Sequence, residues 1–309
     1  PAPGKFPVVL VQTPYSKTVA DVGDGAVPPS IVKRGYLDVI VDVGGTGGSE
    51  GQSQLFGPQE AKDGAELVRW AAKLPQSDGK VGTLGGSYLG IDQLFTAAEV
   101  GPNSPLKAIF PIVSSSDPYR DLFSVGGIVN VESALGLLAA YFGLRTLTPL
   151  ADRGPHDPLD AVRLMIEHGL AGIPFELRTG IDILIQGDRV YDSAYWQERA
   201  PQRVLDKIVA NDVPAYLVGG QYDVFQRGEP LLYSGLQNAS LGRSVWDPMT
   251  KGQVANPKWQ LQTGPFDHST AGQNLDEIEL RWFDQWLKGE DTGILDTSRP
   301  MHIHETTGD

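Results

Sequence analysis

Short apolar runs rich in β-branched residues alternate along this chain with longer segments that have the periodicity of amphipathic helices. The apolar runs cover residues 7–11, 37–43, 80–84, 106–112, 215–219 and 259–262. The helical patterns between them cover residues 59–74, 88–100, 228–237 and 275–287. Buried runs that alternate with amphipathic helices predict an α/β fold, in which helices cover both faces of a mostly parallel sheet.

The alternation stops between about residues 116 and 211. Helical patterns at 131–142, 158–168 and 194–210 follow one another there, and no run between them reads as a buried strand. We therefore predict a helical insertion at 117–211 between two parts of one core, 1–116 and 212–309. Open α/β sheets bind ligands beyond the carboxyl ends of their strands, so we expect the insertion to form a cap over that edge. A helical decoration away from the site is the alternative.

Composition and charge exclude several classes of function. The formal net charge of −13 argues against nucleic acid or an anionic membrane as a partner. The chain has no cysteine, which excludes disulfides, thiolate metal sites and a cysteine nucleophile. No apolar run approaches the roughly 18 residues of a membrane span. We expect a soluble protein, either cytoplasmic or secreted after removal of a leader, and the oligomeric state stays open, with a homo-oligomer included.

The most informative stretch is Lys80-Val-Gly-Thr-Leu-Gly-Gly-Ser-Tyr-Leu-Gly90. An apolar strand runs into glycines, a single serine and a helical pattern, as a nucleophile elbow requires. Ser87 would then stand at the edge of the sheet, and the backbone N–H of Tyr88 could face an oxyanion. The usual G-x-S-x-G pattern is incomplete because Leu89 occupies the second glycine position and Gly90 follows one residue later. An ordinary glycine-rich turn is the alternative.

A serine nucleophile needs a base, and the base needs a group that orients it. In α/β proteins with a nucleophile elbow the chain order is serine, acid, histidine. His156 and His168 fall within the insertion, before any core acid that could follow the serine. His302 and His304 alternate with apolar residues at the C-terminus, as on a strand, and no carboxylate set adjoins them for a metal site. His268 follows a core strand and is the predicted base.

The predicted acid is Asp223, which follows the buried run 215–219 and a glycine turn. Asp212 precedes that run and Asp247 lies in a polar loop, so neither stands at a strand end. Asp267 adjoins His268, and neighbours in sequence rarely orient each other's side chains. The alternative for Asp223 is a turn or helix-capping aspartate.

These motifs resemble those of the α/β-hydrolase family that contains cocaine esterase, X-prolyl dipeptidyl-peptidase and α-amino-acid ester hydrolase. The elbow of that family carries its second glycine one position late, as this chain does. The resemblance covers nearly the whole chain and includes the segments PVVLVQTPYSK (7–17), GSYLG (86–90), DSAYW (192–196), GGQYD (219–223), GPFDH (264–268) and RWFDQWLKG (281–289). It implies the α/β-hydrolase fold with a helical cap.

The resemblance also implies a reaction. Ser87, His268 and Asp223 would hydrolyse small carboxylic esters through an acyl-enzyme, with no metal or organic cofactor. The family's second oxyanion donor, a tyrosine hydroxyl, falls on Tyr15. An X-prolyl dipeptidyl-peptidase or an amino-acyl ester or amide hydrolase is the first alternative, because the same groups cleave amides and peptides. A hydrolase-fold binding protein without catalysis is the second.

Three positions of the insertion are candidate substrate contacts. A peptidase of this type would need carboxylates that face the substrate ammonium, and Asp188 or Asp192 could supply one. Trp196 lies with Asp192 in the segment 192–196 that resembles the family, and it is a further candidate substrate contact. Solvated acids at helix ends are the alternative interpretation of these aspartates.

The chain departs from the family in two places. The loop that usually reads Asp-x-Arg-Gly-x-Gly carries Gly44 in place of the arginine, so we expect the ion pair that steadies it to be absent or supplied elsewhere. This loop also fails the dinucleotide-binding spacing, because Glu50 stands where the last glycine would be. Relatives usually continue into a C-terminal β jelly roll, which we expect to be absent or cut off, since residues 287–304 look like the crossing into it.

Overall fold

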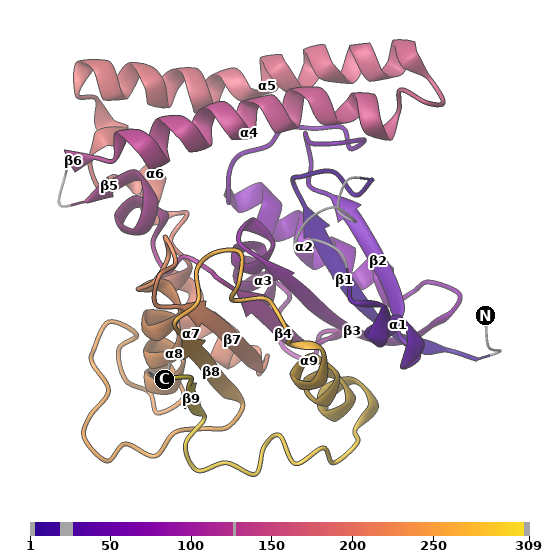
Figure 1. Ribbon diagram of the computed structural model, residues 1–309, viewed down its shortest axis with the longest axis vertical. Helices are drawn as coiled ribbons and strands as arrows, with labels where there is room; N and C mark the ends of the chain where they lie inside the picture. The colour runs from indigo at the N-terminus through magenta and orange to yellow at the C-terminus, as the bar shows by residue number, and fades with distance from the viewer. Residues whose placement is uncertain (1–3, 19–26, 126–127, 306–309) are drawn as a thin grey trace.

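The computed structural model describes residues 4–18, 27–125 and 128–305. Within these residues the core is a seven-stranded, wholly parallel sheet in the order β2-β1-β3-β4-β7-β8-β9 (Figure 1). All six predicted strands are present, and the alternating residues near the C-terminus add the edge strand. The bounds are β1 (Phe6–Thr13), β2 (Leu37–Asp42), β3 (Ser77–Gly86), β4 (Leu106–Ile112), β7 (Ala215–Gly220), β8 (Trp259–Gly264) and β9 (Met301–Ile303).

Helices cover both faces of this sheet, as the sequence predicts. Alternate residues of β1 show the two sides: Val8 and Leu10 belong to one buried cluster, and Val9 and Val11 belong to the other. The first cluster includes residues of α2 (Pro58–Ala71), α3 (Tyr88–Glu99), α7 (Leu205–Ala210) and α8 (Gly228–Ala239). The second includes residues of α1 (Pro29–Lys33), α9 (Asp276–Phe283) and the following turn η5 (Asp284–Lys288). Both faces of the central strands are therefore buried, which explains the apolar runs in β1, β4 and β7.

Two long helices, α4 (Val131–Asp152) and α5 (Pro158–Ile185), pack side by side above one edge of the sheet (Figure 1). They extend well beyond the predicted segments 131–142 and 158–168 and run through Pro149 and Pro174. Packing of one helix along the other outweighs the local cost of these prolines. No helix within the described residues combines the length and apolarity needed to cross a membrane.

The remainder of the insertion differs from the prediction in detail. The expected helix 194–210 is divided into α6 (Ala194–Gln197), a turn that begins at Pro201, and α7. α7 packs against α3 and α8, in the layer that covers the sheet. A small hairpin, β5 (Ser124–Val125) with β6 (Ile128–Val129), was not expected from the sequence. The boundaries 117 and 211 stay a prediction.

Glu279 of α9 is a buried carboxyl whose Oε2 has no hydrogen-bond partner among the described residues. Burial, with the nearby charge of Asp276, raises its pKa from 4.5 to about 8. The folded protein then retains a proton that the unfolded chain releases, so the free energy of unfolding should fall by up to about 1.4 kcal/mol per pH unit between about pH 5 and 8. Glu279→Gln should make this slope shallower in urea unfolding measured across that range, because the contribution of Glu279 is removed. The exposed Glu277→Gln is the control, and equal slopes in wild type and Glu279→Gln would contradict the prediction.

Candidate active site

Ser87 lies between β3 and α3, in a sharp turn that requires unusual backbone angles. Its φ and ψ are 60° and −122°, a strained conformation for a residue with a side chain. Its N–H donates to the carbonyl of Ile112 at 2.9 Å, so the turn is tied to the end of β4. A Cβ at Gly90 would collide with Ser114 Oγ and lie 2.7 Å from Ile112 O. The second glycine is needed one position late because the helix passes the end of β4 there.

Ser87 is the first member of a hydrogen-bonded chain of three side chains. His268 Nε2 lies 2.9 Å from Ser87 Oγ, and His268 Nδ1 lies 2.7 Å from Asp223 Oδ2. Asp223 is buried, and its other carboxylate oxygen accepts the N–H of Phe225. A carboxylate at Nδ1 favours the tautomer that is protonated there, in which Nε2 carries no proton and can accept that of the serine. The arrangement is that of nucleophile, base and orienting acid.

The acid and the base follow neighbouring strands, and their loops are bonded to each other. Asp223 comes after β7 and His268 after β8, so parallel pairing brings both to the same edge of the sheet as Ser87. The N–H of Tyr222 donates to the carbonyl of Phe266 at 3.0 Å. A Cβ at Gly220 would collide with that same carbonyl. This close approach fixes Asp223 relative to His268.

A cavity of about 150 Å³ adjoins Ser87 and His268. Tyr15 and Tyr88 are among the residues that line it, together with apolar side chains of the core and of α4. As the first residue of α3, Tyr88 has an N–H with no acceptor inside the helix. The other lining residues are Leu55, Phe56, Ile91, Ser115, Pro118, Leu122, Ala140, Tyr141, Leu144, Val224 and Phe225.

A buried polar chain behind this cavity was missed by the sequence analysis. The phenol of Tyr88 donates to Glu60 Oε2 at 2.7 Å, and Tyr141 OH lies 3.5 Å from Tyr88 OH and contacts Ser53 Oγ. Burial raises the pKa of Glu60 and that of Tyr88. In the sequence Glu60 reads as an ordinary acidic residue of a first helical turn, and Tyr141 lies 53 residues beyond Tyr88. Neither residue carries a local signal of this role.

The predicted substrate contacts of the insertion are not among the residues that line the cavity. Asp192 accepts a hydrogen bond from Arg120 at 2.6 Å, so its charge is already paired. Trp196 is 1% exposed and packs against Phe123, and its indole N–H donates to the carbonyl of Arg189. Asp188 begins a short turn at the surface. We therefore leave these three residues out of the candidate site.

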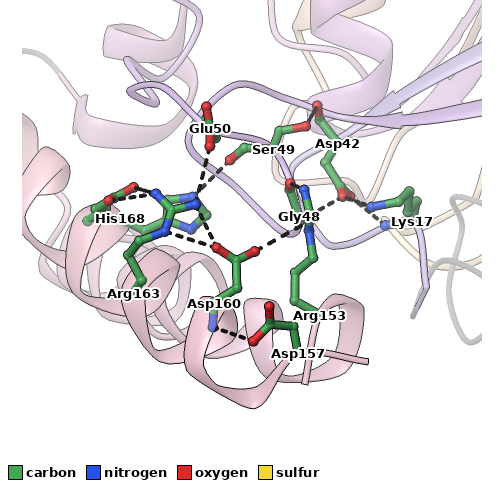
Figure 2. A network of polar contacts seen from close by, with 11 residues as sticks. Lys17, Asp42, Gly48, Ser49, Glu50, Arg153, Asp157, Asp160, Arg163 and His168 are labelled. Carbon is green, nitrogen blue, oxygen red and sulfur yellow. Dashed lines mark hydrogen bonds and ion pairs between the residues drawn. The ribbon is translucent and has the colours of Figure 1, made fainter. Parts of the chain in front are cut away.

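The glycine-rich loop 43–51 is anchored without the arginine that Gly44 replaces (Figure 2). Asp42 accepts the N–H of Gly48 at 2.9 Å and the N–H of Lys17 at 2.6 Å, and it pairs with the Lys17 ammonium. The loop is thereby closed upon the end of β2 by a buried carboxylate.

The helical pair α4–α5 holds the same loop from the other side (Figure 2). Arg153, just after α4, donates to the carbonyl of Gly48 at 2.9 Å. His168 of α5 is buried, and its Nε2 lies 2.9 Å from the carbonyl of Ser49. Arg163 pairs with Glu50 at 3.2 Å. The sequence left open whether the ion pair that steadies this loop is absent or supplied by other residues. In the structure other residues supply polar contacts to the loop, among them Lys17, Arg153 and Arg163.

The family model of the X-Pro dipeptidyl-peptidase (S15 family) matches residues 1–270. This chain belongs to the S15 family. It is 30% identical over 310 residues to the cocaine esterase of Rhodococcus sp. (strain MB1 Bresler), a match that covers 94% of this chain and 51% of that protein. The predicted family is confirmed, and the chain spans about half the length of that relative.

Solved structures agree on the fold. A CocE/NonD family hydrolase from Staphylococcus aureus superposes with a TM-score of 0.64 at 21% identity, over 98% of this chain and 48% of that chain. An α-amino acid ester hydrolase superposes with a TM-score of 0.62 at 21% identity, over 98% of this chain and 53% of that chain. The predicted α/β-hydrolase fold is confirmed.

The crossing at Gly90 yields a test of the elbow. Gly90→Ala should destabilise the protein by about 1–3 kcal/mol, the usual range for overpacking, because neither Ile112 nor its strand can withdraw. Gly180→Ala is the matched control, since a Cβ at that helical position has nothing within 4 Å. Thermal unfolding measures both variants. A Gly90→Ala protein as stable as wild type would show that the elbow is less closely packed than described.

Proposed function

We propose that the protein is a serine hydrolase that cleaves small carboxylic esters by acyl transfer to water. His268 takes the proton of Ser87 as Oγ attacks the ester carbonyl, and Asp223 holds the imidazole tautomer and stabilises the imidazolium. His268 then protonates the departing alkoxide, and water hydrolyses the acyl-enzyme by the same steps. The observation that carries the proposal is the chain of hydrogen bonds from Asp223 through His268 to Ser87, beside an apolar cavity.

Two donors are proposed for the oxyanion. The N–H of Tyr88 points from the start of α3, where a developing negative charge is favoured. The hydroxyl of Tyr15 is the second, and its side chain lines the same cavity as Ser87. A hole built from one fixed backbone N–H and one phenol needs no metal ion, and we propose no cofactor.

The size and lining of the cavity favour a substrate with a small, apolar acyl group. Its volume, about 150 Å³, is roughly what holds a benzene ring. Ala140, Tyr141 and Leu144 of α4 contribute part of its lining, so we propose that the insertion acts as the predicted cap and helps to select the acyl group. Small-molecule esters are therefore the proposed substrates, rather than nucleic acid or an anionic surface, which the net charge of −13 disfavours.

A peptidase that releases X-Pro dipeptides is the second candidate, because the family is described by that activity. Recognition of a substrate ammonium calls for a carboxylate near the acyl site. None of the described residues that line the cavity is an aspartate or a glutamate. This observation favours esters over substrates with a free amino terminus. The intact hydrogen-bonded triad likewise disfavours a binding protein without catalysis.

A comparison of p-nitrophenyl butyrate with an X-Pro p-nitroanilide tests the proposal directly. We expect the ester to be hydrolysed and the anilide to react far more slowly. Ser87→Ala should lower kcat on the ester by about 10⁶-fold, because loss of the nucleophile removes the whole covalent pathway. Ser104→Ala, at the opposite edge of the sheet, is the control. Full esterase activity in Ser87→Ala would refute the triad, and a faster anilide reaction would favour the peptidase.

Tyr15→Phe tests the second oxyanion donor. Loss of one such donor should lower kcat by about 10²–10³-fold with little change in KM, since the bond strengthens in the transition state. Tyr191→Phe, an exposed tyrosine of the insertion, is the control. A Tyr15→Phe enzyme with the kcat of wild type would remove Tyr15 from the proposed mechanism.

A further inference from the structure

The wall of the cavity includes a strained turn that the proposed mechanism does not use. Leu55 and Phe56, just before α2, are consecutive residues with φ of 50° and 58°. Both are buried, and both line the cavity beside Ser87. The left-handed conformation is unfavourable for a bulky residue, and it persists only where the surroundings impose it.

A single carboxylate holds this turn at both ends. Glu60 Oε1 accepts the N–H of Gln54 at 2.7 Å, and Glu60 Oε2 accepts the N–H of Phe56 at 2.9 Å. N–H groups close together in a turn can form a concave site for an anion. Here that anion belongs to the chain itself, since Glu60 lies in the first turn of α2, where the helix dipole also favours a negative charge.

Glu60 reaches the other wall of the cavity as well. Its Oε2 accepts the phenol of Tyr88 at 2.7 Å, and the rings of Phe56 and Tyr88 pack with their centroids 4.3 Å apart. Arg199 donates to the carbonyl of Gln54 from outside, at 3.3 Å. The turn and the start of α3 are therefore tied through one carboxylate.

Burial of the Glu60 carboxyl group, with a second buried acid nearby, costs folding free energy. Glu60 is 8% exposed, and burial raises its pKa even though three donors favour the charged form. A second acid, Asp92, is 6% exposed nearby, and its Oδ2 has no hydrogen-bond partner among the described residues. Burial of such groups costs folding free energy unless hydrogen bonds or ion pairs satisfy them.

We propose that Glu60 is a positioning residue that sets the acyl-chain specificity of the site. By holding the 54–56 turn against Tyr88, it fixes the distance between two walls of the cavity into which the acyl group of the substrate extends. The proposal rests on the proposed ester hydrolysis. It goes beyond that function by assigning the choice among acyl groups to a carboxylate that contacts no reacting atom.

The test is the ratio of kcat/KM for p-nitrophenyl butyrate to that for p-nitrophenyl octanoate. Glu60→Gln keeps the size of the side chain but replaces one acceptor oxygen by an NH₂ group, which must face a donor of the turn or of Tyr88. We expect the ratio to fall by about tenfold or more, as when an apolar pocket gains room for a methylene group. Glu66→Gln, exposed on the same helix, should keep the ratio of wild type.

Two further variants separate the bonds between Glu60 and the 54–56 turn from the bond between Glu60 and Tyr88. Tyr88→Phe removes the phenol bond but keeps both bonds to the turn, so it should change the ratio less than Glu60→Gln does. If Glu60→Gln does not fold, Glu60→Asp takes its place, because the shorter carboxylate cannot reach both N–H groups. Thermal unfolding shows whether each variant is folded. Labelling of Ser87 with a fluorophosphonate gives the fraction of active sites in each preparation.

The outcomes distinguish this proposal from the one on which it rests. A wild-type protein inactive on every ester refutes the proposed function, and the role of Glu60 in choosing among acyl groups is refuted with it. An active wild type whose acyl-chain ratio is unchanged in folded Glu60→Gln, or fully reproduced by Tyr88→Phe, refutes the role of Glu60. A lower ratio in Glu60→Gln with no change in Glu66→Gln supports it.

Discussion

The crossing of α3 over the end of β4 is the contact on which the candidate site depends. The carbonyl of Ile112 accepts the N–H of Ser87, and no side chain fits at Gly90 between the helix and the strand. This close packing holds Ser87 in a conformation that an isolated chain would avoid, and it directs the serine toward the loops that follow β7 and β8. The strain is local, whereas the apolar burial that sustains it is spread over both faces of the sheet.

Two buried acids lie close together at the triad, and Asp223 is the one that bonds to His268. Glu229, at the start of α8, is fully buried and accepts the N–H of Ser114. Burial raises its pKa well above the ordinary value, and the nearby charge of Asp223 adds to that shift. A second negative charge makes a buried carboxyl group harder to ionise, so the protonated form of Glu229 is favoured. Asp223 is the carboxylate that bonds to the imidazole, at 2.7 Å from Nδ1.

The sequence predicts those features that depend on local pattern or on chain order. The strands follow from short runs rich in apolar and β-branched residues. The meeting of Ser87, Asp223 and His268 follows from parallel strands whose carboxyl ends share one edge. Contacts between distant segments that lack a motif are not predictable in this way. Nothing in the sequence around Glu60 indicates that it accepts a bond from Tyr88, 28 residues later. The full length of α5, through Pro174, likewise depends on packing against α4.

The chain from the end of β2 to the start of α2 joins these contacts into one support for the cavity. Its first part, the loop 43–51, is held by Asp42 and by residues of the α4–α5 pair. Its last part, the 54–56 turn, is held by Glu60. Ser53 stands between the two and contacts Tyr141 of α4, which itself lines the cavity. A displacement of α4 and α5 would therefore act on the cavity wall twice, through Tyr141 directly and through the loop that leads to Leu55 and Phe56.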